Sequence, residues 1–322
     1  MDRAVTTTHG PRPRIVVTGA NGNVGRNLLA HASASGDIDV VAAVRSERAA
    51  ASLASIAGGP GGPGRPAAID VRVVDVEKVT ELAPVLAGAT SLVHLSGILF
   101  ESRTATYEQA NVAATAAAVD ACRSAGVPHI VLISALGADP GATNRYWRSK
   151  GDGERLVEAS GLAATIIRTP ILLGPDTAGA NGFIRAIMSG KVTLLGGGRY
   201  LMRPLDIDDL SAAILSVCRS HPAGAHVHEL AGPEPIAYRD LVARLASQMG
   251  RTVSYSTVPL WAARLGAAVN HRIKGAGITP TVIDVITTSE AVPHNADGAL
   301  GLTLTPLAKT LDKIVTAWRH TS

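Results

Sequence analysis

Tyr146 and Lys150 form the residue pair in this sequence whose chemistry is most suggestive of catalysis. They are four positions apart at the start of a stretch expected to be helical, so both side chains lie on one helix face. A nearby ammonium group stabilises a tyrosinate and lowers the pKa of the tyrosine toward the working pH. The spacing therefore predicts a tyrosine that exchanges a proton with a carbonyl or an alcohol.

A second group of residues has the composition of an anion site. The run TGANGNVG at 18–25 places Gly19, Gly22 and Gly25 between an apolar strand and a helix. Such glycines permit a tight turn, a close approach of the backbone to a diphosphate, and close packing of helix on strand. The helix N-terminus adds unpaired N–H groups. We therefore expect a dinucleotide here, with a plain glycine turn as the alternative.

The residue about 20 positions after these glycines bears on which dinucleotide is bound. NAD-binding units usually carry an acid there, whereas this chain has Arg45, which cannot accept a hydrogen bond from a ribose but can pair with a 2′-phosphate. Arg48 could assist, and Glu47 is a competing acid beyond the expected place. The sequence favours NADP(H), with NAD(H) possible and an exposed surface role for Arg45 as the alternative.

Alternating strands and helices would position these residues. Short apolar runs predict strands at 14–18, 39–44, 69–74, 91–95, 130–134 and 164–167, and the segments between them predict helices at 23–35, 49–56, 79–86, 107–125 and 147–160. This alternation is typical of an α/β fold, a Rossmann-type doubly wound parallel sheet that binds ligands at the carboxyl ends of its strands.

The expected domain organisation follows from where this alternation stops. Residues 1–13 read as a flexible tail, 14–170 as the NAD(P)-binding Rossmann domain, and 171–322 mostly as a smaller C-terminal substrate or lid lobe, with 205–230 a candidate to rejoin the sheet. Helices are expected in the lobe at 183–188, 207–219, 238–249, 260–269 and 307–320. The Gly/Pro-rich stretch 58–66 reads as a surface loop.

With its G-x-x-G-x-x-G spacing, the chain resembles the short-chain dehydrogenase/reductase superfamily, in its extended or atypical branches, from residue 14 to about 250. It is similar to the NAD(P)H-binding accessory subunit of respiratory complex I and to NAD-dependent epimerase/dehydratase proteins. The segments that carry the likeness to the complex I subunit are GILFE at 97–101, ISALGAD at 133–139, RYWRSK at 145–150, and GGGR at 196–199 followed by Pro204, Asp208 and Asp209.

The resemblance implies further site residues. Asp75 and Val76 would hold an adenine ring, the stretch Leu95, Ser96 and Gly97 would pass the cofactor ribose, and Pro170 would lie by the nicotinamide. Lys150 would also hold the nicotinamide ribose beside Tyr146. The implied phosphate-binding residues are Gly19, Ala20, Asn21, Gly22, Asn23, Val24 and Gly25.

The superfamily's third catalytic group is a hydroxyl that polarises the substrate oxygen. Ser134 is the candidate here, but relatives carry the hydroxyl one or two residues later, where this chain has Ala135 and Leu136. A structural role for Ser134 is the alternative. Two functions therefore stay open: an NADP(H)-dependent oxidoreductase or epimerase, and a non-catalytic NADP(H)-binding structural or redox-sensing protein.

Composition excludes several other functions. Although the formal net charge is +4, no basic cluster indicates nucleic-acid binding. Neither a secretion signal nor a run of ~18 apolar residues occurs, so a cytoplasmic location is expected. Cys122 and Cys218 read as buried reduced thiols, and no metal-ligand spacing is seen. The expected partner is a small-molecule substrate, with Arg199 and Arg203 as possible anion-binding or exposed residues, and an oligomer is possible.

Overall fold

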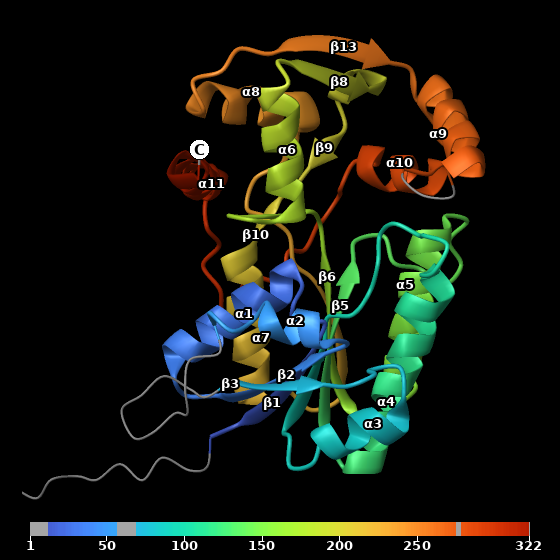
Figure 1. Cartoon of the computed structure of the whole chain (residues 1–322), viewed down its shortest axis with the longest axis vertical. Coiled ribbons are helices and arrows are strands. Elements are labelled where there is room, and N and C mark those ends of the chain that lie inside the picture. The colour runs from blue at the N-terminus through green and yellow to red at the C-terminus, as the bar shows by residue number, and fades with distance from the viewer. Residues whose placement is uncertain (1–11, 57–68, 275–277, 322) are drawn as a thin grey trace, which may run out of the picture.

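The computed structural model describes residues 12–56, 69–274 and 278–321. Its centre is a parallel sheet of seven strands in the order β11-β6-β5-β4-β1-β2-β3 (Figure 1). The strands are β1 (Arg14–Thr18), β2 (Asp39–Val44), β3 (Ile69–Val73), β4 (Ser91–His94), β5 (His129–Ala135), β6 (Ala163–Thr169) and β11 (Ala225–Glu229). The order reverses between β1 and β4, where an α/β sheet opens a crevice for ligands. The fold is therefore the doubly wound Rossmann type that the sequence predicts.

Apolar residues on successive strand positions serve opposite faces of this sheet. Ile15 and Val17 pack with one core cluster, whereas Val16, between them, packs with the other. The first face is covered by α1 (Asn23–Ser35), α2 (Glu47–Ala51) and α7 (Ile207–Ser220), and the second by α3 (Val79–Val85), α4 (Ala114–Ala125) and α5 (Arg145–Glu158). Burial on both faces explains why these strands are apolar throughout.

Two helices differ from the sequence-based expectation. The helix expected at 49–56 is the short α2, which ends at Ala51 and continues as turns. The single helix expected at 107–125 begins as a π-helical segment (Glu108–Ala113) and becomes α-helical only in α4. Such wider turns interrupt α-helices frequently at functional sites. Here the segment carries a buried asparagine, Asn111, whose contacts are described below.

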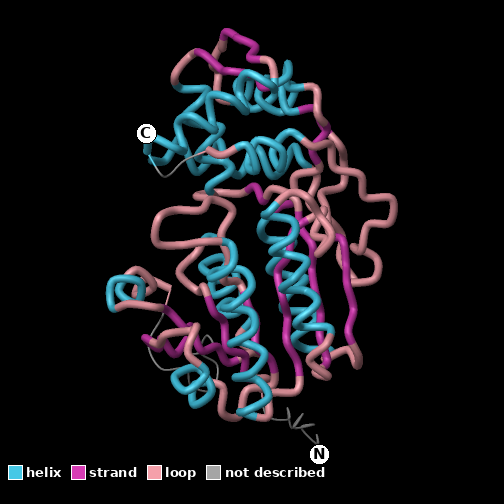
Figure 2. Tube along the Cα trace, turned by 90° about the vertical axis from the view of Figure 1, so that its right-hand side faces the viewer, coloured by secondary structure: helices cyan, strands magenta, loops and turns pink. Residues whose placement is uncertain are grey.

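The C-terminal lobe lies beyond the carboxyl ends of the strands (Figures 1 and 2). Its core is formed by α6 (Ala178–Met188), α8 (Tyr238–Gln248) and α11 (Leu307–Thr321). Three strand pairs join distant segments: β7 (Leu172–Leu173) with β10 (Leu205–Asp206), β8 (Lys191–Leu195) with β13 (Ser254–Val258), and β9 (Leu201–Met202) with β12 (Ile236–Ala237). Helices α9 (Leu260–Lys274) and α10 (Pro280–Thr287) complete the lobe.

Three expectations for the lobe are wrong or incomplete. The short strands were not expected: β7, β9, β10 and β12 have only two residues each, and every strand of the lobe pairs with a partner distant in the sequence. Helix α6 begins five residues before the expected start at 183, since Thr177 caps it by accepting from Ala180 N. Helix α10, capped by Thr279, was not expected at all.

Segment 205–230 crosses from the lobe back to the sheet. It supplies β10, then α7, which packs on α1, and then β11, which pairs with β6 at the sheet edge. Asp206 connects two helices: its buried carboxylate caps α7 and also forms an ion pair with Lys313 Nζ of α11 at 2.6 Å. The C-terminal helix α11 is thereby attached to the Rossmann part of the molecule.

The two cysteines are buried and free, Cys122 in α4 and Cys218 in α7, and burial raises the pKa of each thiol to about 12. His226 and His228 lie on the edge strand β11 with their rings stacked 6.1 Å apart. None of the helices in the described ranges is long and apolar enough to cross a bilayer. The expected tail at 1–13, apart from its last two residues, and the loop at 58–66 lie outside the described residues.

Candidate functional site

The glycine turn between β1 and α1 has the backbone geometry of a phosphate loop. Gly19 adopts a φ of +68°, and a Cβ there would stand 3.1 Å from the carbonyl carbon of Leu95. Gly25 is buried against β1's end, where a Cβ would overlap the carbonyl oxygen of Ala20. These positions therefore require glycine, the first for its conformation and the second for helix packing.

The start of α1 leaves backbone donors for a ligand. Gly22 is the N-cap and provides no side chain, and the helical ladder begins only with Arg26 N donating to Gly22 O. The amides of the first turn thus have no intrahelical acceptor and no side-chain cap. Together with the positive end of the helix dipole they suit a diphosphate. The residues present fit the pyrophosphate of a dinucleotide.

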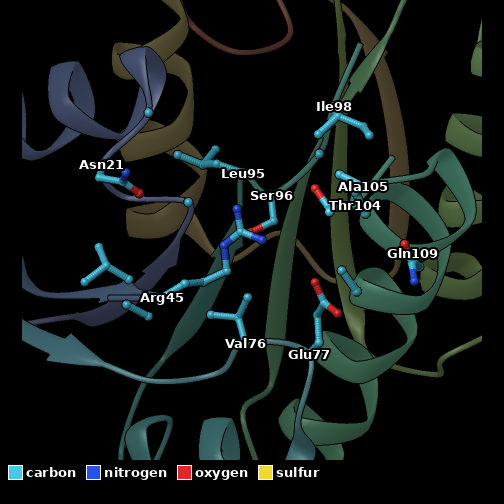
Figure 3. Close-up of a pocket in the computed structure, with 17 residues that line it drawn as sticks. Asn21, Arg45, Val76, Glu77, Leu95, Ser96, Ile98, Thr104, Ala105 and Gln109 are labelled. Atoms are coloured by element: carbon cyan, nitrogen blue, oxygen red, sulfur yellow. The ribbon is translucent and has the colours of Figure 1, made fainter. Parts of the chain in front are cut away.

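A cavity of about 260 Å³ opens beside this turn, at the crevice between β1, β2 and β4. Figure 3 shows its lining. Eight of the residues expected to bind the cofactor are brought together there: Gly19, Asn21, Gly22, Arg45, Val76, Leu95, Ser96 and Gly97. The lining also includes residues that the sequence did not indicate, among them Glu77, Ile98, Thr104, Ala105 and Gln109. Ile98 lies in the GILFE segment but was not expected to bind the cofactor, and no motif marks the other four.

Arg45 supplies the cation of this cavity. Its exposed side chain reaches from the end of β2 across the space toward Ser96 (Figure 3), and it has no ion-pair partner in the part of the chain that the structure describes. Arg48 and Glu47 do not line the cavity, whereas Glu77 does. The competing acid at the site is therefore Glu77, after β3, and not Glu47.

Other residues expected at the cofactor lie outside the cavity. The carboxylate of Asp75 accepts from Glu77 N at 3.1 Å and pairs with Lys78. Asn23 Nδ2 donates to Asp176 O at 2.7 Å, which ties the phosphate loop to the lobe. Ala20 and Val24 pack in the hydrophobic core, and Pro170 follows β6. From its place Ala20, which is fully buried, could reach a ligand only through its backbone.

Tyr146 and Lys150 lie on the first turns of α5. Asn144 caps this helix, its Oδ1 accepting from Tyr146 N at 3.0 Å and from Trp147 N at 3.3 Å. Lys150 is buried, and its Nζ donates to Ile133 O on β5 at 2.8 Å. A Cβ on Gly97 would stand 3.7 Å from that nitrogen. The ammonium group thus lies beside the backbone that follows β4, next to the cavity.

Burial sets the protonation of both groups. It lowers the pKa of Lys150 to about 8, although Glu154 opposes the change. Burial raises the pKa of Tyr146, and the hydroxyl of Tyr107, whose ring lies 5.7 Å away, adds to the increase. The expectation that Lys150 lowers the pKa of Tyr146 is therefore wrong for this structure, because desolvation dominates and the ammonium is bonded to β5.

Ser134 lies near the end of β5 and is buried. Its Oγ has no hydrogen-bond partner among the described residues, so the alternative role of satisfying the strand's backbone is not seen. Ala135 ends the strand, and Leu136 N donates to Thr169 O at 3.1 Å. The two positions where relatives carry a hydroxyl are thus filled by apolar residues.

Asn111 and His94 surround Lys150 and were not singled out by the sequence. Asn111 Oδ1 accepts from Ile98 N at 2.9 Å, and its Nδ2 donates to Ser149 Oγ at 2.9 Å, which joins the loop after β4 to α5. His94 Nδ1 lies 2.9 Å from Thr18 Oγ1, and its Nε2 has no partner within the described ranges. Burial and, to a smaller extent, Lys150 lower the pKa of His94 to about 3.

Arg203 is not available to a substrate. Its Nε donates to Gly232 O at 3.1 Å and its Nη1 to Val292 O at 3.0 Å, so the guanidinium holds lobe segments together. Arg199 is exposed. Across the described residues, no three His, Cys, Asp or Glu side chains gather as they would around a metal ion.

Comparisons with known proteins agree with this geometry. The profile of a family described as NAD(P)H-binding matches residues 19–186, slightly more than half of the chain. NADH dehydrogenase (ubiquinone) 1 alpha subcomplex subunit 9 of Arabidopsis thaliana is 26% identical over 57% of this chain and 46% of its own length. The chain therefore spans less than half of that relative.

Two further proteins match over more of their length. The 4-hydroxy-2-methyl-3-oxo-4-farnesyl-3,4-dihydroquinoline-1-oxide ketoreductase of Stigmatella aurantiaca is 27% identical over 81% of this chain and 80% of its own length. The structure of MoeE5 in complex with UDP-glucuronic acid and NAD superposes with a TM-score of 0.73 at 20% identity, over 96% of this chain and 100% of that chain. That structural likeness establishes the shared fold.

Proposed function

The chain belongs to the NAD(P)H-binding family, and from that premise we propose that it is an NADP(H)-dependent oxidoreductase that reduces the carbonyl group of a small molecule. The observation that carries the proposal is the position of Tyr146 and Lys150. Both project from the capped start of α5, and Lys150 is anchored to β5 beside Gly97, which lines the cavity. The ammonium of Lys150 is thereby held next to the end of the cavity that follows β4, one helical turn from Tyr146.

The cofactor side of the proposal rests on the glycine turn and the cavity beside it. The amides at the start of α1 would hold the diphosphate, and the backbone from Leu95 to Gly97 would lie along the ribose. Arg45 supports NADP(H) over NAD(H), because a guanidinium pairs with a 2′-phosphate by charge-assisted hydrogen bonds. Glu77 at the same cavity would oppose that phosphate, and it is the feature that favours NAD(H) as the second possibility.

The proposed chemistry needs one hydride and one proton. A reduced nicotinamide, when bound, would supply the hydride. Tyr146 donates its phenolic proton to the carbonyl oxygen, which becomes the alcohol. Since burial raises the pKa of Tyr146, this residue is a phenol and not a phenolate at neutral pH, as an acid must be. Lys150 in its ammonium form would donate to the nicotinamide ribose and so hold the cofactor beside Tyr146.

The hydroxyl that assists the tyrosine in relatives is missing from its usual positions, which are Ala135 and Leu136 here. Ser134 has a buried and unpartnered Oγ, and we assign it the role of second donor to the substrate oxygen. An unsatisfied hydroxyl costs free energy in the apo protein and gains a partner when a ligand arrives. This residue's contribution is separable from that of Tyr146 by mutation.

The relative from Stigmatella aurantiaca, which matches over most of both chains, supports a ketone as the substrate class. The Stigmatella protein is named as a ketoreductase and aligns over 80% of its length, which supports ketone reduction over sugar epimerisation. The nucleotide-sugar ligand of MoeE5 does not transfer at 20% identity. A non-catalytic NADP(H)-binding role is the competing function. In that case the protein would bind NADPH tightly but would not turn over any substrate.

The test uses the purified full chain and NADPH carrying deuterium at C4 of the nicotinamide. We expect a panel of lipophilic and polar ketones to yield at least one alcohol with deuterium on its carbinol carbon, detected by mass spectrometry. The same panel with labelled NADH should give slower transfer. Saturable NADPH binding with no labelled product across the panel would support the binding role and reject the reductase.

A further inference from the structure

Helix α9 carries an apolar face that nothing in the described structure covers. Trp261 is 70% exposed, Leu265 60% and Val269 51%, the three largest exposed fractions among the large apolar side chains that the structure describes. They follow one another at intervals of four, so they form a single stripe along the helix. Ala267, on the opposite side, is buried against the lobe. The helix is therefore amphipathic, with its apolar stripe toward solvent.

All the charged side chains of α9 are basic. Its sequence, LWAARLGAAVNHRIK, contains no Asp or Glu. Arg272 is exposed one turn beyond Val269 and has no ion-pair partner among the described residues. Arg264 flanks the stripe and pairs with Asp284 of α10 at 2.8 Å. The stripe thus ends at an unpaired cation, on a chain whose net charge is +4.

We propose that the stripe Trp261, Leu265 and Val269, with Arg272, docks this protein on the surface of an anionic lipid bilayer. A basic amphipathic helix with Trp and Leu on its apolar side lies in the membrane interface, held by apolar burial and by attraction to anionic headgroups. Tryptophan suits that depth because one part of its ring is apolar and its N–H is polar. No membrane span is needed.

A second copy of the chain fits the stripe less well. A twofold interface sets the same surface against itself. Here it would bring Arg272 of each copy to a face whose helix has no acid to receive it. Three side chains in a row also provide much less than the ~800 Å² per partner of a stable interface. Anionic headgroups satisfy the cation, and a bilayer accepts a narrow apolar stripe.

The position of the helix agrees with peripheral docking. In Figure 1, α9 is at the outer edge of the lobe and packs on α10. Helix α10 in turn contacts α5, where Asn144 Nδ2 donates to Thr281 O at 3.1 Å. The stripe is therefore separated from the start of α5 by a single helix.

The experiment measures co-sedimentation of the full chain with phosphatidylcholine vesicles, with and without one-third phosphatidylglycerol, at low and high salt. We expect binding that requires phosphatidylglycerol and weakens in high salt. The double variant Trp261→Ser/Leu265→Ser should weaken binding to phosphatidylglycerol vesicles about 10- to 100-fold. Arg272→Glu should lower binding to these vesicles to the level found with phosphatidylcholine alone. Val227→Ser/Leu201→Ser, at exposed apolar positions on β11 and β9, is the matched control and should bind as the wild type does.

Each variant is first shown to unfold at the wild-type temperature, so that loss of vesicle binding is not loss of fold. Wild-type protein that sediments with neither vesicle would reject the proposal, as would a double variant that binds like the wild type. A dimer that forms in solution and is lost in the double variant, without vesicle binding, would assign the stripe to a second copy. Because no substrate is used, the result does not depend on the proposed reductase activity.

Discussion

Lys150 Nζ donates to the carbonyl oxygen of Ile133 at 2.8 Å, which attaches the first turns of α5 to β5. This one bond joins the helix that bears Tyr146 to the strand edge where the cavity opens. It also keeps a buried ammonium satisfied, since an unpaired buried cation would be expensive. Catalysis, cofactor binding and stability near this bond can be tested separately.

Tyr146→Phe should abolish most turnover while leaving the cofactor site intact. Removing a general acid typically lowers the rate about 100- to 10,000-fold. The dissociation constant of NADPH, measured by fluorescence titration, should change less than about twofold, because the phenyl ring keeps its packing on Tyr107. Tyr255→Phe, on the exposed strand β13, is the control and should retain full activity. Equal activity of both variants would remove Tyr146 from the mechanism.

The activity should decline as pH rises through about 8. Burial lowers the pKa of Lys150 to about 8, so the ammonium form predominates below that pH and is lost above it. Above the pKa, kcat/KM for carbonyl reduction should fall roughly tenfold per pH unit, since the neutral amine lacks the charge with which Lys150 would hold the cofactor ribose. Lys150→Arg, which stays charged, should flatten this alkaline limb. A wild-type profile that is level to pH 10 would contradict the assignment.

Arg45→Ala should weaken NADPH binding selectively. A charge-assisted hydrogen bond contributes about 1.5–3 kcal/mol, which corresponds to about 10- to 100-fold in the dissociation constant. Binding of NADH, which lacks the 2′-phosphate, should change little. Arg48→Ala is the matched control, because Arg48 does not line the cavity. Tighter binding of NADH than NADPH, with neither affected by Arg45→Ala, would assign the protein to NAD(H).

Two glycines three positions apart should respond differently to the same substitution. In Gly25→Ala the new Cβ meets the backbone of Ala20, which cannot move without β1, so unfolding free energy should fall by about 1–3 kcal/mol or more. In Gly22→Ala the Cβ stands 3.2 Å from Gly19 O, at the cavity, so the fold should survive while NADPH binding weakens. Thermal unfolding and cofactor titration of both variants distinguish the two effects. Identical losses of stability would contradict the distinction.

His94 should make the protein sensitive to acid. Burial lowers its pKa to about 3 in the folded chain, whereas in the unfolded chain it is near 6.5. Between these values the unfolded state binds more protons, so the free energy of unfolding falls as pH decreases below 6.5, by up to about 1.4 kcal/mol per pH unit. Chemical denaturation of His94→Asn between pH 4 and 7 should show a shallower slope. His228→Asn, at a half-exposed position on β11, is the comparison and should leave most of the slope unchanged.

Much of the fold could be predicted because its causes are local. The apolar runs of β1 and β2, each followed by a helical pattern, indicate a sheet covered on both faces. The glycine turn marks where β1 ends and α1 begins. The boundaries moved where side chains outside the local pattern intervene: Thr177 starts α6 early, and the contacts of Asn111 accompany a π-helical segment.

The lobe shows the limit of local reasoning. Strands such as β9 and β12 have two residues each, and neither has an apolar period to read. They are strands only because each supplies the other's hydrogen bonds, and their partners lie more than 30 positions away. The same holds for Arg203: its guanidinium donates to backbone carbonyls of two distant segments, so it is not free to bind an anion.

By itself the sequence determined which residues could take part: the glycines of the turn, Arg45 after the second strand, and Tyr146 with Lys150 on one helix face. Only the tertiary structure decided their surroundings: that Glu77 and not Glu47 shares the cavity with Arg45, that burial raises the pKa of Tyr146, and that α9 presents an apolar stripe to solvent. The reason is physical. Spacing along the chain fixes which way neighbouring side chains point, whereas desolvation and charge at a site depend on atoms contributed by segments far apart in sequence.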